Sequence, residues 1–257
     1  MSRFNSLEFG DEHDGQSSLQ KVLPRGEADY IAEARLAFEN ANFEQGLRLY
    51  SKVLEFNPGN AVAWTGQVRM LIELGEFREA RLWADKALER FPHEPELLAS
   101  KAVALARGGD LEGAIAFSDA SIEERGDTPY IWLARGDVLL ARAEPRADYC
   151  FEKALLLAPR DWFIVWLAAR VRHYYHQFVL ALKLLQQAIE WNTAHFVLWL
   201  ELGRCQQALS LISLAKNSFA QAQELNPECE ARAALDQVSR TGLAARVRGL
   251  WRRISSR

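Results

Sequence analysis

The sequence predicts an all-α protein built as a solenoid of paired helices, and two regularities along the chain carry that prediction. Small residues recur six times at intervals of 33 or 34 residues, and glycine and proline punctuate the segments between them. The recurring small residues are Gly46, Ala80, Ala114, Ala147, Ala181 and Ala215. A period of this length over six copies indicates a repeat architecture in which each unit is one supersecondary structure.

Further positions keep the same register in each unit and predict where its second helix ends. Seven residues after each small residue comes a second compact residue, and four units place a proline five residues later. The compact residues are Val53, Ala87, Ser121, Ala154, Ala188 and Ala222, and the prolines are Pro58, Pro92, Pro159 and Pro227. Because proline cannot continue a helix, each of these prolines predicts a helix end.

The first helix of each unit begins near an aromatic or aliphatic anchor, which is followed four residues later on the same face by a compact residue. The anchors are Tyr30, Trp64, Leu98, Trp132, Val165 and Trp199, and the compact residues are Ala34, Val68, Ala102, Gly136, Ala169 and Gly203. The compact residue predicts a close approach of the second helix. Breakers at residues 73–77, 107–111 and 143–147 separate the two helices. Thr128 and Asp161 are expected to cap two of the first helices.

The segment WLELGRCQQALSLISLAKNSFAQAQELNP (199–227) resembles a tetratricopeptide repeat at nearly every signature position. Those positions are Trp199, Leu202, Gly203, Ala215, Phe219, Ala222 and Pro227. The resemblance covers residues 27–239, as six repeats and the start of a closing helix. It implies a right-handed superhelical α-solenoid whose first helices line a concave groove, and the function of a non-catalytic protein-binding scaffold or adaptor. Arg172 and Gln206 depart from the pattern, since the family has aromatic or large apolar residues there.

The groove positions of the last three repeats are apolar or aromatic and are flanked by arginine, which is typical of interaction surfaces. The predicted partner-binding residues are Tyr130, Leu133, Phe163, Trp166, Arg170, Val197, Leu200 and Arg204, with Arg35 and Arg69 as a secondary set. The expected partner is a protein segment, either an amphipathic helix or an extended peptide with acidic residues. In the alternative interpretation, a tight superhelix buries these positions against neighbouring repeats or the chain's own tail.

The two ends of the chain differ from the repeats. Residues 1–26 lack periodicity and are rich in serine, glycine and acids, so we expect a disordered tail. Residues 240–257 contain six arginines and no acid, with apolar residues on one stripe of a predicted amphipathic helix. Its contact residues are expected to be Leu243, Arg246, Val247, Leu250, Trp251, Arg252 and Arg253.

A basic amphipathic helix of this kind docks on the chain's own acidic body, on an acidic partner or on an anionic membrane surface. The membrane case gives the alternative function, a membrane-peripheral assembly factor recruited through residues 240–257.

The distribution of charge along the chain also bears on whether the protein binds nucleic acid. The net charge is −3, and because residues 240–257 carry +6 and residues 1–26 carry −1, residues 27–239 carry −8. Such an acidic body argues against nucleic acid as a partner.

No catalytic site, cofactor or metal is expected. The sequence has no glycine loop of the phosphate-binding or dinucleotide-binding type and no nucleophile elbow. His173 and His176 lie one helical turn apart, but no carboxylate or cysteine stands at matching spacing, so a structural role is favoured over a metal site. The cysteines, Cys150, Cys205 and Cys229, are few and scattered, which fits a reducing cytoplasm. The N-terminus also lacks an apolar export signal. The sequence does not decide whether the protein forms oligomers.

Overall fold

The structure is a computed structural model that describes residues 26–124 and 127–238. Within these ranges helices are the only regular secondary structure, and twelve of them form six helical hairpins, which confirms the predicted all-α solenoid. They are α1 (Glu27–Glu39), α2 (Phe43–Phe56), α3 (Ala61–Glu73), α4 (Phe77–Arg90), α5 (Pro95–Arg107), α6 (Leu111–Glu123), α7 (Pro129–Ala141), α8 (Ala147–Leu157), α9 (Trp162–Tyr174), α10 (Phe178–Trp191), α11 (Phe196–Ala208) and α12 (Ile212–Leu225).

We number the hairpins as repeats one to six, in chain order. After α12, residues 231–238 are helical as well, and Ala231 and Val238 pack with Leu200 and Phe219 in a core cluster at the end of repeat six. The tail expected at residues 1–26, apart from Gly26, and the basic helix expected at residues 240–257 lie outside the described residues.

The helices end where the sequence places its breakers. Each of the four recurring prolines stands two residues after the last residue of a second helix, as Pro58 does after Phe56. The three predicted breakers separate α3 from α4, α5 from α6 and α7 from α8. These predicted boundaries are therefore confirmed.

The two predicted N-caps behave differently. The Asp161 carboxylate accepts a hydrogen bond of 2.9 Å from the backbone N–H of Phe163, so it caps α9 as predicted. Thr128 occupies the N-cap position of α7, but its side chain makes no capping bond. Its hydroxyl donates instead to the Glu96 carboxylate at 2.8 Å, which ties the start of α7 to α5. Thr128 is therefore the N-cap residue of α7, as predicted, but without a side-chain capping bond.

The turn within each hairpin is closed by one backbone motif. A residue with φ between 55° and 93° stands in every turn, namely Ala41, Gly75, Gly109, Ala143, His176 and Ser210. The next N–H donates to the carbonyl five residues earlier, as Glu76 does to Leu71 at 2.9 Å, which is the Schellman pattern. Four of the six turns hold this left-handed conformation without glycine, so they carry backbone strain.

Close packing within the hairpins confirms the predicted role of the compact residues. A Cβ atom added to Gly203 would lie 2.5 Å from the Phe219 ring, and one added to Gly136 would lie 2.9 Å from the Phe151 ring. Each ring of the second helix therefore rests directly on the backbone of the first helix, where alanine does not fit without a shift.

The two departures from the repeat pattern are packed through polar contacts. Gln206 is buried and accepts a hydrogen bond of 2.8 Å from the Ser218 hydroxyl. The Arg172 guanidinium lies 4.1 Å from the centre of the Phe151 ring and forms an ion pair of 2.6 Å with Asp148. These contacts replace the apolar packing that other repeats use at the same positions.

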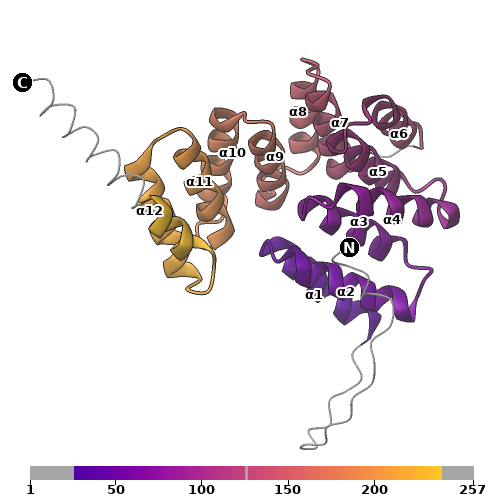
Figure 1. Cartoon of the computed structure of the whole chain (residues 1–257), viewed down its shortest axis with the longest axis horizontal. Helices are drawn as coiled ribbons and strands as arrows, with labels where there is room; N and C mark the ends of the chain where they lie inside the picture. The colour runs from indigo at the N-terminus through magenta and orange to yellow at the C-terminus, as the bar shows by residue number, and fades with distance from the viewer. Residues whose placement is uncertain (1–25, 125–126, 239–257) are drawn as a thin grey trace, which may run out of the picture.

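The hairpins curl so strongly that repeat five returns to repeats one and two. In Figure 1 the chain runs from α1, in indigo, round through α8 and back, so that α9 comes to lie near α1. The rings of Phe38 in α1 and Phe163 in α9 meet edge to face with centroids 5.1 Å apart. The concave face is therefore crossed by the chain's own side chains.

Candidate functional site

Most of the predicted groove residues have side chains that are buried or partly buried. The side chains of Leu133, Trp166, Val197 and Leu200 are buried, with at most 4% of their surface exposed, and those of Tyr130 and Phe163 are partly buried. The expectation of an open apolar groove at these positions was wrong, because the tight superhelix packs them against neighbouring repeats. A partner-binding role for these residues stays a prediction.

Phe38 is the residue that fills this part of the concave face. Its ring contacts Phe163 and also lies 6.3 Å from the Trp166 ring. The Arg69 guanidinium stacks between repeats, 4.9 Å from the Phe38 ring centre and 3.7 Å from that of Tyr130. Arg69, expected to contact a partner, is thus held by aromatic rings of its own chain.

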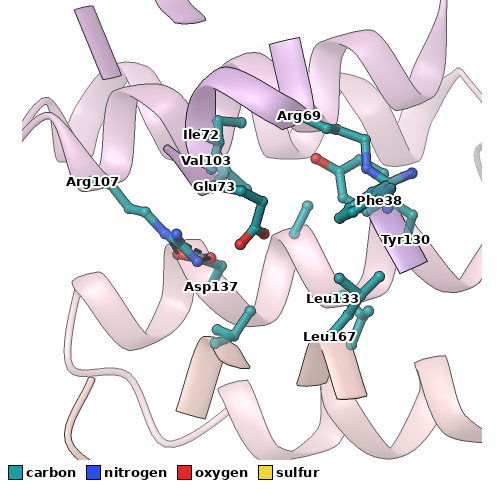
Figure 2. A pocket seen from close by; sticks show the side chains of 12 residues that line it. Phe38, Arg69, Ile72, Glu73, Val103, Arg107, Tyr130, Leu133, Asp137 and Leu167 are labelled. Atoms are coloured by element: carbon teal, nitrogen blue, oxygen red, sulfur yellow. Dashed lines mark hydrogen bonds and ion pairs between the residues drawn. The ribbon is translucent and has the colours of Figure 1, made fainter. Parts of the chain in front are cut away.

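Arg107, Asp137 and Tyr175 form a buried polar cluster, and Figure 2 shows the first two of these residues. Arg107 donates to the Asp137 carboxylate at 2.6 Å, and the Tyr175 hydroxyl donates to the same carboxylate at 2.8 Å. Burial and the neighbouring Asp137 carboxylate raise the pKa of Tyr175. Figure 2 shows Arg107, Asp137, Tyr130 and Phe38 round a cavity of about 30 Å³, which is too small for anything larger than water.

The remaining predicted arginines are paired with carboxylates of the same chain. Arg170 of α9 binds Glu73 at 2.5 Å and Glu201 at 2.7 Å. Arg204 binds Glu201 at 2.8 Å and also pairs with Glu230. Arg35, on the exposed side of α1, pairs with Glu39 at 3.0 Å.

The buried pairs are electrostatically stable. Burial opposes the charge of Arg170, but the carboxylates of Glu73 and Glu201 outweigh it and raise the pKa of Arg170. Burial likewise opposes the charge of Glu201, but Arg170 and Arg204 lower the pKa of Glu201 below its usual range. The positive charges of Arg170 and Arg204 are therefore already paired with carboxylates of the same chain.

A wide cavity of about 730 Å³ opens where the turn between α1 and α2 faces α11 and the loop after α12. We call it the mouth cavity. Its apolar wall is formed by Phe43, Leu74, Phe196 and Leu200, and its charged wall by Glu44, Glu73, Arg170, Arg204, Glu228 and Glu230. It adjoins a second cavity of about 330 Å³, since Glu73, Arg170 and Arg204 line both.

The mouth cavity carries an excess of negative charge. Four carboxylates and two guanidinium groups line it, and both guanidinium groups are already paired. Glu44, in the first turn of α2, and Glu228, in the loop after α12, have no ion-pair partner among the residues that the structure describes. This wall therefore attracts a positively charged group.

The same wall holds the accessible thiol of the chain. Cys229 is half-buried and lines the mouth cavity, whereas Cys150 and Cys205 are buried in the helix pairs. Burial raises the pKa of the Cys205 thiol to about 12 and raises that of Cys150 as well. Cys229 is thus the cysteine that an oxidant or a second thiol reaches most readily.

Sequence reasoning missed most of the mouth cavity. Phe43 and Glu44 begin a second helix, and residues 226–230 form a connecting loop, so none belongs to the periodic face from which the groove was predicted. They meet only because the superhelix brings repeat one opposite repeat six. Repeat spacing gives no signal for a contact of that kind.

The described residues contain neither a cluster of metal-binding side chains nor a helix that could span a membrane. Nowhere in residues 26–124 and 127–238 do three histidine, cysteine or acidic side chains stand together as a metal site requires. The rings of His173 and His176 both pack on Phe178, at 5.2 and 5.5 Å. In that part of the chain no helix has the length and apolar character needed to cross a bilayer.

Comparison with solved structures shows proteins of the same fold. A tetratricopeptide repeat protein from Parabacteroides merdae is 16% identical with a TM-score of 0.53, covering 86% of this chain and 87% of that one. A thermophilic tetratricopeptide repeat protein from Thermus thermophilus is 16% identical with a TM-score of 0.50, covering 83% and 98%. The human IFIT1 dimer with PPP-AAAA is 18% identical with a TM-score of 0.51, covering 85% of this chain but only 57% of that one.

Comparison with sequences agrees with the fold. A search of curated proteins finds no match. The sequence model of the family described as tetratricopeptide repeat matches residues 31–95 and 71–129, and the structure continues the same hairpin through repeats four to six. Residues 31–129 therefore belong to the tetratricopeptide repeat family, and the later hairpins share its fold.

Proposed function

We propose that this protein is a non-catalytic scaffold that holds a segment of a partner protein in the mouth cavity. Solenoids of this family are protein-interaction scaffolds that bind through their concave surfaces. The observation that carries the proposal is the position of the mouth cavity, a large opening on a concave face whose middle is filled by the chain's own side chains. The cytoplasmic location expected from the sequence is part of the same proposal.

The size and apolar wall of the mouth cavity suit a peptide anchor. A volume of about 730 Å³ lies within the range of ordinary ligand pockets, which is roughly 300 to 1,000 Å³. Phe43 of repeat one and Phe196 of repeat six line it, and Leu200 lines it one helical turn after Phe196 in α11. One or two apolar side chains of a partner would be buried there, while the rest of the segment stays near the charged rim.

The charge of the rim favours a partner segment with lysine or arginine. The sequence predicted acidic residues in the partner because four arginines fall at groove positions. Since these arginines are held by carboxylates or rings of the chain, the charge left for a partner is that of Glu44 and Glu228. Opposite charges across an interface speed association and exclude partners of the wrong sign.

Three of the predicted groove residues, Arg170, Leu200 and Arg204, line the mouth cavity and remain part of the proposed site. A partner that reached Trp166 would first have to displace Phe38. Removing a buried phenylalanine from its packing typically costs about 3 kcal/mol or more. We therefore place the partner at the mouth cavity and not along the middle of the concave face.

The experiment is a selection of random peptides displayed on phage against the full chain. We expect the selected peptides to share basic residues beside an aromatic or aliphatic anchor. Each is then measured by fluorescence polarisation against a double variant, Glu44→Lys with Glu228→Lys. The reversal of two charges should weaken binding about tenfold or more, because close charge pairs contribute about 1.5 kcal/mol or more.

The matched control is Glu89→Lys with Glu190→Lys, which reverses two exposed charges on the second helices α4 and α10. It changes the net charge of the protein equally and should leave binding unchanged. Selection of acidic peptides, or equal weakening by both double variants, would show that the mouth cavity is not the binding site.

A further inference from the structure

We propose that the C-terminal segment of this chain, residues 240–257, docks in the mouth cavity of its own solenoid. The inference concerns the same cavity as the proposed function, but it requires no partner protein. It rests on where the described chain ends, on the charge of the cavity and on the sequence of the segment.

The end of the described chain lies beside the mouth cavity. Glu228, Cys229 and Glu230 line it, and the helical residues 231–238 follow directly. Eight helical residues advance the chain by only about 12 Å. Residues 239–242, with the sequence Ser-Arg-Thr-Gly, favour a reversal of direction. The fifteen residues from 243 to 257 would span about 22 Å as a helix, which is enough to return to the cavity.

The segment has the charge that the cavity lacks. Residues 240–257 contain six arginines and no acid. The cavity presents Glu44 and Glu228 without an ion-pair partner among the described residues, and Glu230 shares its charge with Arg204 at the rim. Docking would give these carboxylates arginine partners, and such contacts are strongest at low ionic strength.

The segment also has an apolar stripe to match the apolar wall. In a helix, Leu243, Val247 and Leu250 fall on one face, beside Trp251 and Ile254, while most of the arginines fall elsewhere. Phe43, Leu74 and Phe196 are the groups of the cavity that this stripe would cover. Attachment to the same chain places the segment at an effective concentration of about a millimolar, so weak contacts suffice.

A consequence follows for partner binding. A segment of a partner with basic residues and an apolar anchor would have to displace residues 240–257 before it entered the cavity. Only a partner segment that binds the cavity more tightly than residues 240–257 would therefore enter it. Without such a partner, residues 240–257 would cover the apolar wall.

The experiment traps the segment with the natural thiol of Cys229. A cysteine is introduced in the full chain by Val247→Cys, on the apolar stripe, or by Ala245→Cys, which is two residues away and on the opposite side of the helix. Under mild oxidation we expect the first variant to form an intramolecular disulfide with Cys229 about tenfold faster than the second, since docking raises the local thiol concentration. Peptide mapping by mass spectrometry identifies the bond.

Two further measurements make the result specific to the cavity. Adding Glu44→Lys to the Val247→Cys variant should slow trapping severalfold, as should high salt, whereas adding Glu89→Lys should not. Equal rates of disulfide formation at the two cysteine positions would overturn the inference. Disulfides that form only between molecules would also overturn it, because they would indicate that the segment docks on a second copy of the chain. It would also be overturned if trapping were absent and residues 240–257 were required for binding to anionic vesicles.

This experiment is independent of the peptide selection. Trapping without any selected peptide would support the docked segment and count against partner binding at the cavity. Selected peptides that bind the cavity while trapping fails would retain the proposed function and exclude the docked segment.

Discussion

Glu73 and Arg170 are 97 residues apart in the chain, yet their side chains form an ion pair of 2.5 Å across the concave face. Glu73 ends α3 in repeat two, and Arg170 lies in α9 of repeat five. Arg170 continues the network to Glu201 in repeat six, at 2.7 Å. Three repeats are therefore joined through one guanidinium group, and each of its two acidic partners is largely shielded from water.

The contribution of this pair to stability is measurable. Glu73→Gln removes a carboxylate from a largely buried guanidinium group and should lower the free energy of unfolding by about 2 kcal/mol, as for a hydrogen bond to a charged group. Urea titration followed by circular dichroism measures the change. Glu89→Gln, at an exposed site, should alter it by less than about 0.5 kcal/mol. Similar values for both variants would show that the pair does not hold the repeats together.

Phe38 should contribute far more to stability than Phe56, an exposed aromatic residue of the same repeat. Phe38→Ala leaves a cavity against Phe163 and Trp166 and should cost about 3 kcal/mol of stability. Phe56→Ala is the control, because Phe56 is 65% exposed and its ring stacks on Tyr30 of the same repeat, with centroids 5.9 Å apart. Hydrogen exchange in α9 should rise in the first variant alone. Unchanged exchange in α9 would contradict the packing of α1 on α9.

Exchanging alanine and glycine in the turns inside the hairpins should change stability in opposite directions at Ala143 and at Gly75. Ala143 has φ 55°, and Ala143→Gly should raise stability by up to about 1 kcal/mol, because glycine adopts this conformation without strain. Gly75 has φ 79° in the equivalent turn, and a Cβ atom added there meets no other atom. Gly75→Ala should therefore lower stability by about 1 kcal/mol through the backbone alone. Thermal unfolding of both variants tests this, and a shift of the same sign in both would refute it.

Two histidines predict how stability depends on pH. Burial lowers the pKa of His173 and of His195 below the ordinary value. Histidines in the unfolded chain titrate near pH 6.5, as usual for the side chain. The stability that the neutral rings contribute is complete above that pH and is lost as the pH falls toward their lower folded-state pKa values, because only the unfolded chain takes up protons there.

The measurement is the free energy of unfolding between about pH 7 and pH 5, across the unfolded-state titration. The double variant His173→Gln, His195→Gln should show a flatter profile than the natural chain. The exposed residue His93 provides the control through His93→Gln. A profile that stays equally steep in the double variant would assign the pH dependence to other groups.

The sequence predicted the helices well, but it did not predict how strongly the row of hairpins curves. Local rules decide where α2 ends before Pro58 and why Gly203 accepts Phe219, so periodicity and breakers suffice for them. The contact of Phe38 with Phe163 depends on small rotations summed over four hairpins, and no residue spacing encodes that sum. For the same reason the spacing of residues did not indicate that Leu133, Trp166, Val197 and Leu200, four of the eight predicted groove residues, are buried.

The sequence likewise predicted some residues of the mouth cavity and missed others. Arg170, Leu200 and Arg204 were found because they lie on the periodic face of the first helices. Glu44 and Glu228 were not, because Glu44 lies at the start of a second helix and Glu228 lies in a loop, so neither belongs to the face of the first helices used for the prediction. Since these two carboxylates set the sign of the charge on the cavity, the sequence predicted a partner of the opposite chemistry to the one now proposed.

The contact between α1 and α9 changes how this solenoid folds. Repeat arrays usually behave as one-dimensional chains in which each unit touches only its neighbours, so that end units fray and folding spreads from any point. Here repeat one cannot melt without uncovering Trp166 in repeat five. We therefore expect the first five repeats to unfold together, and folding to bear the entropy of closing a loop that spans most of the chain.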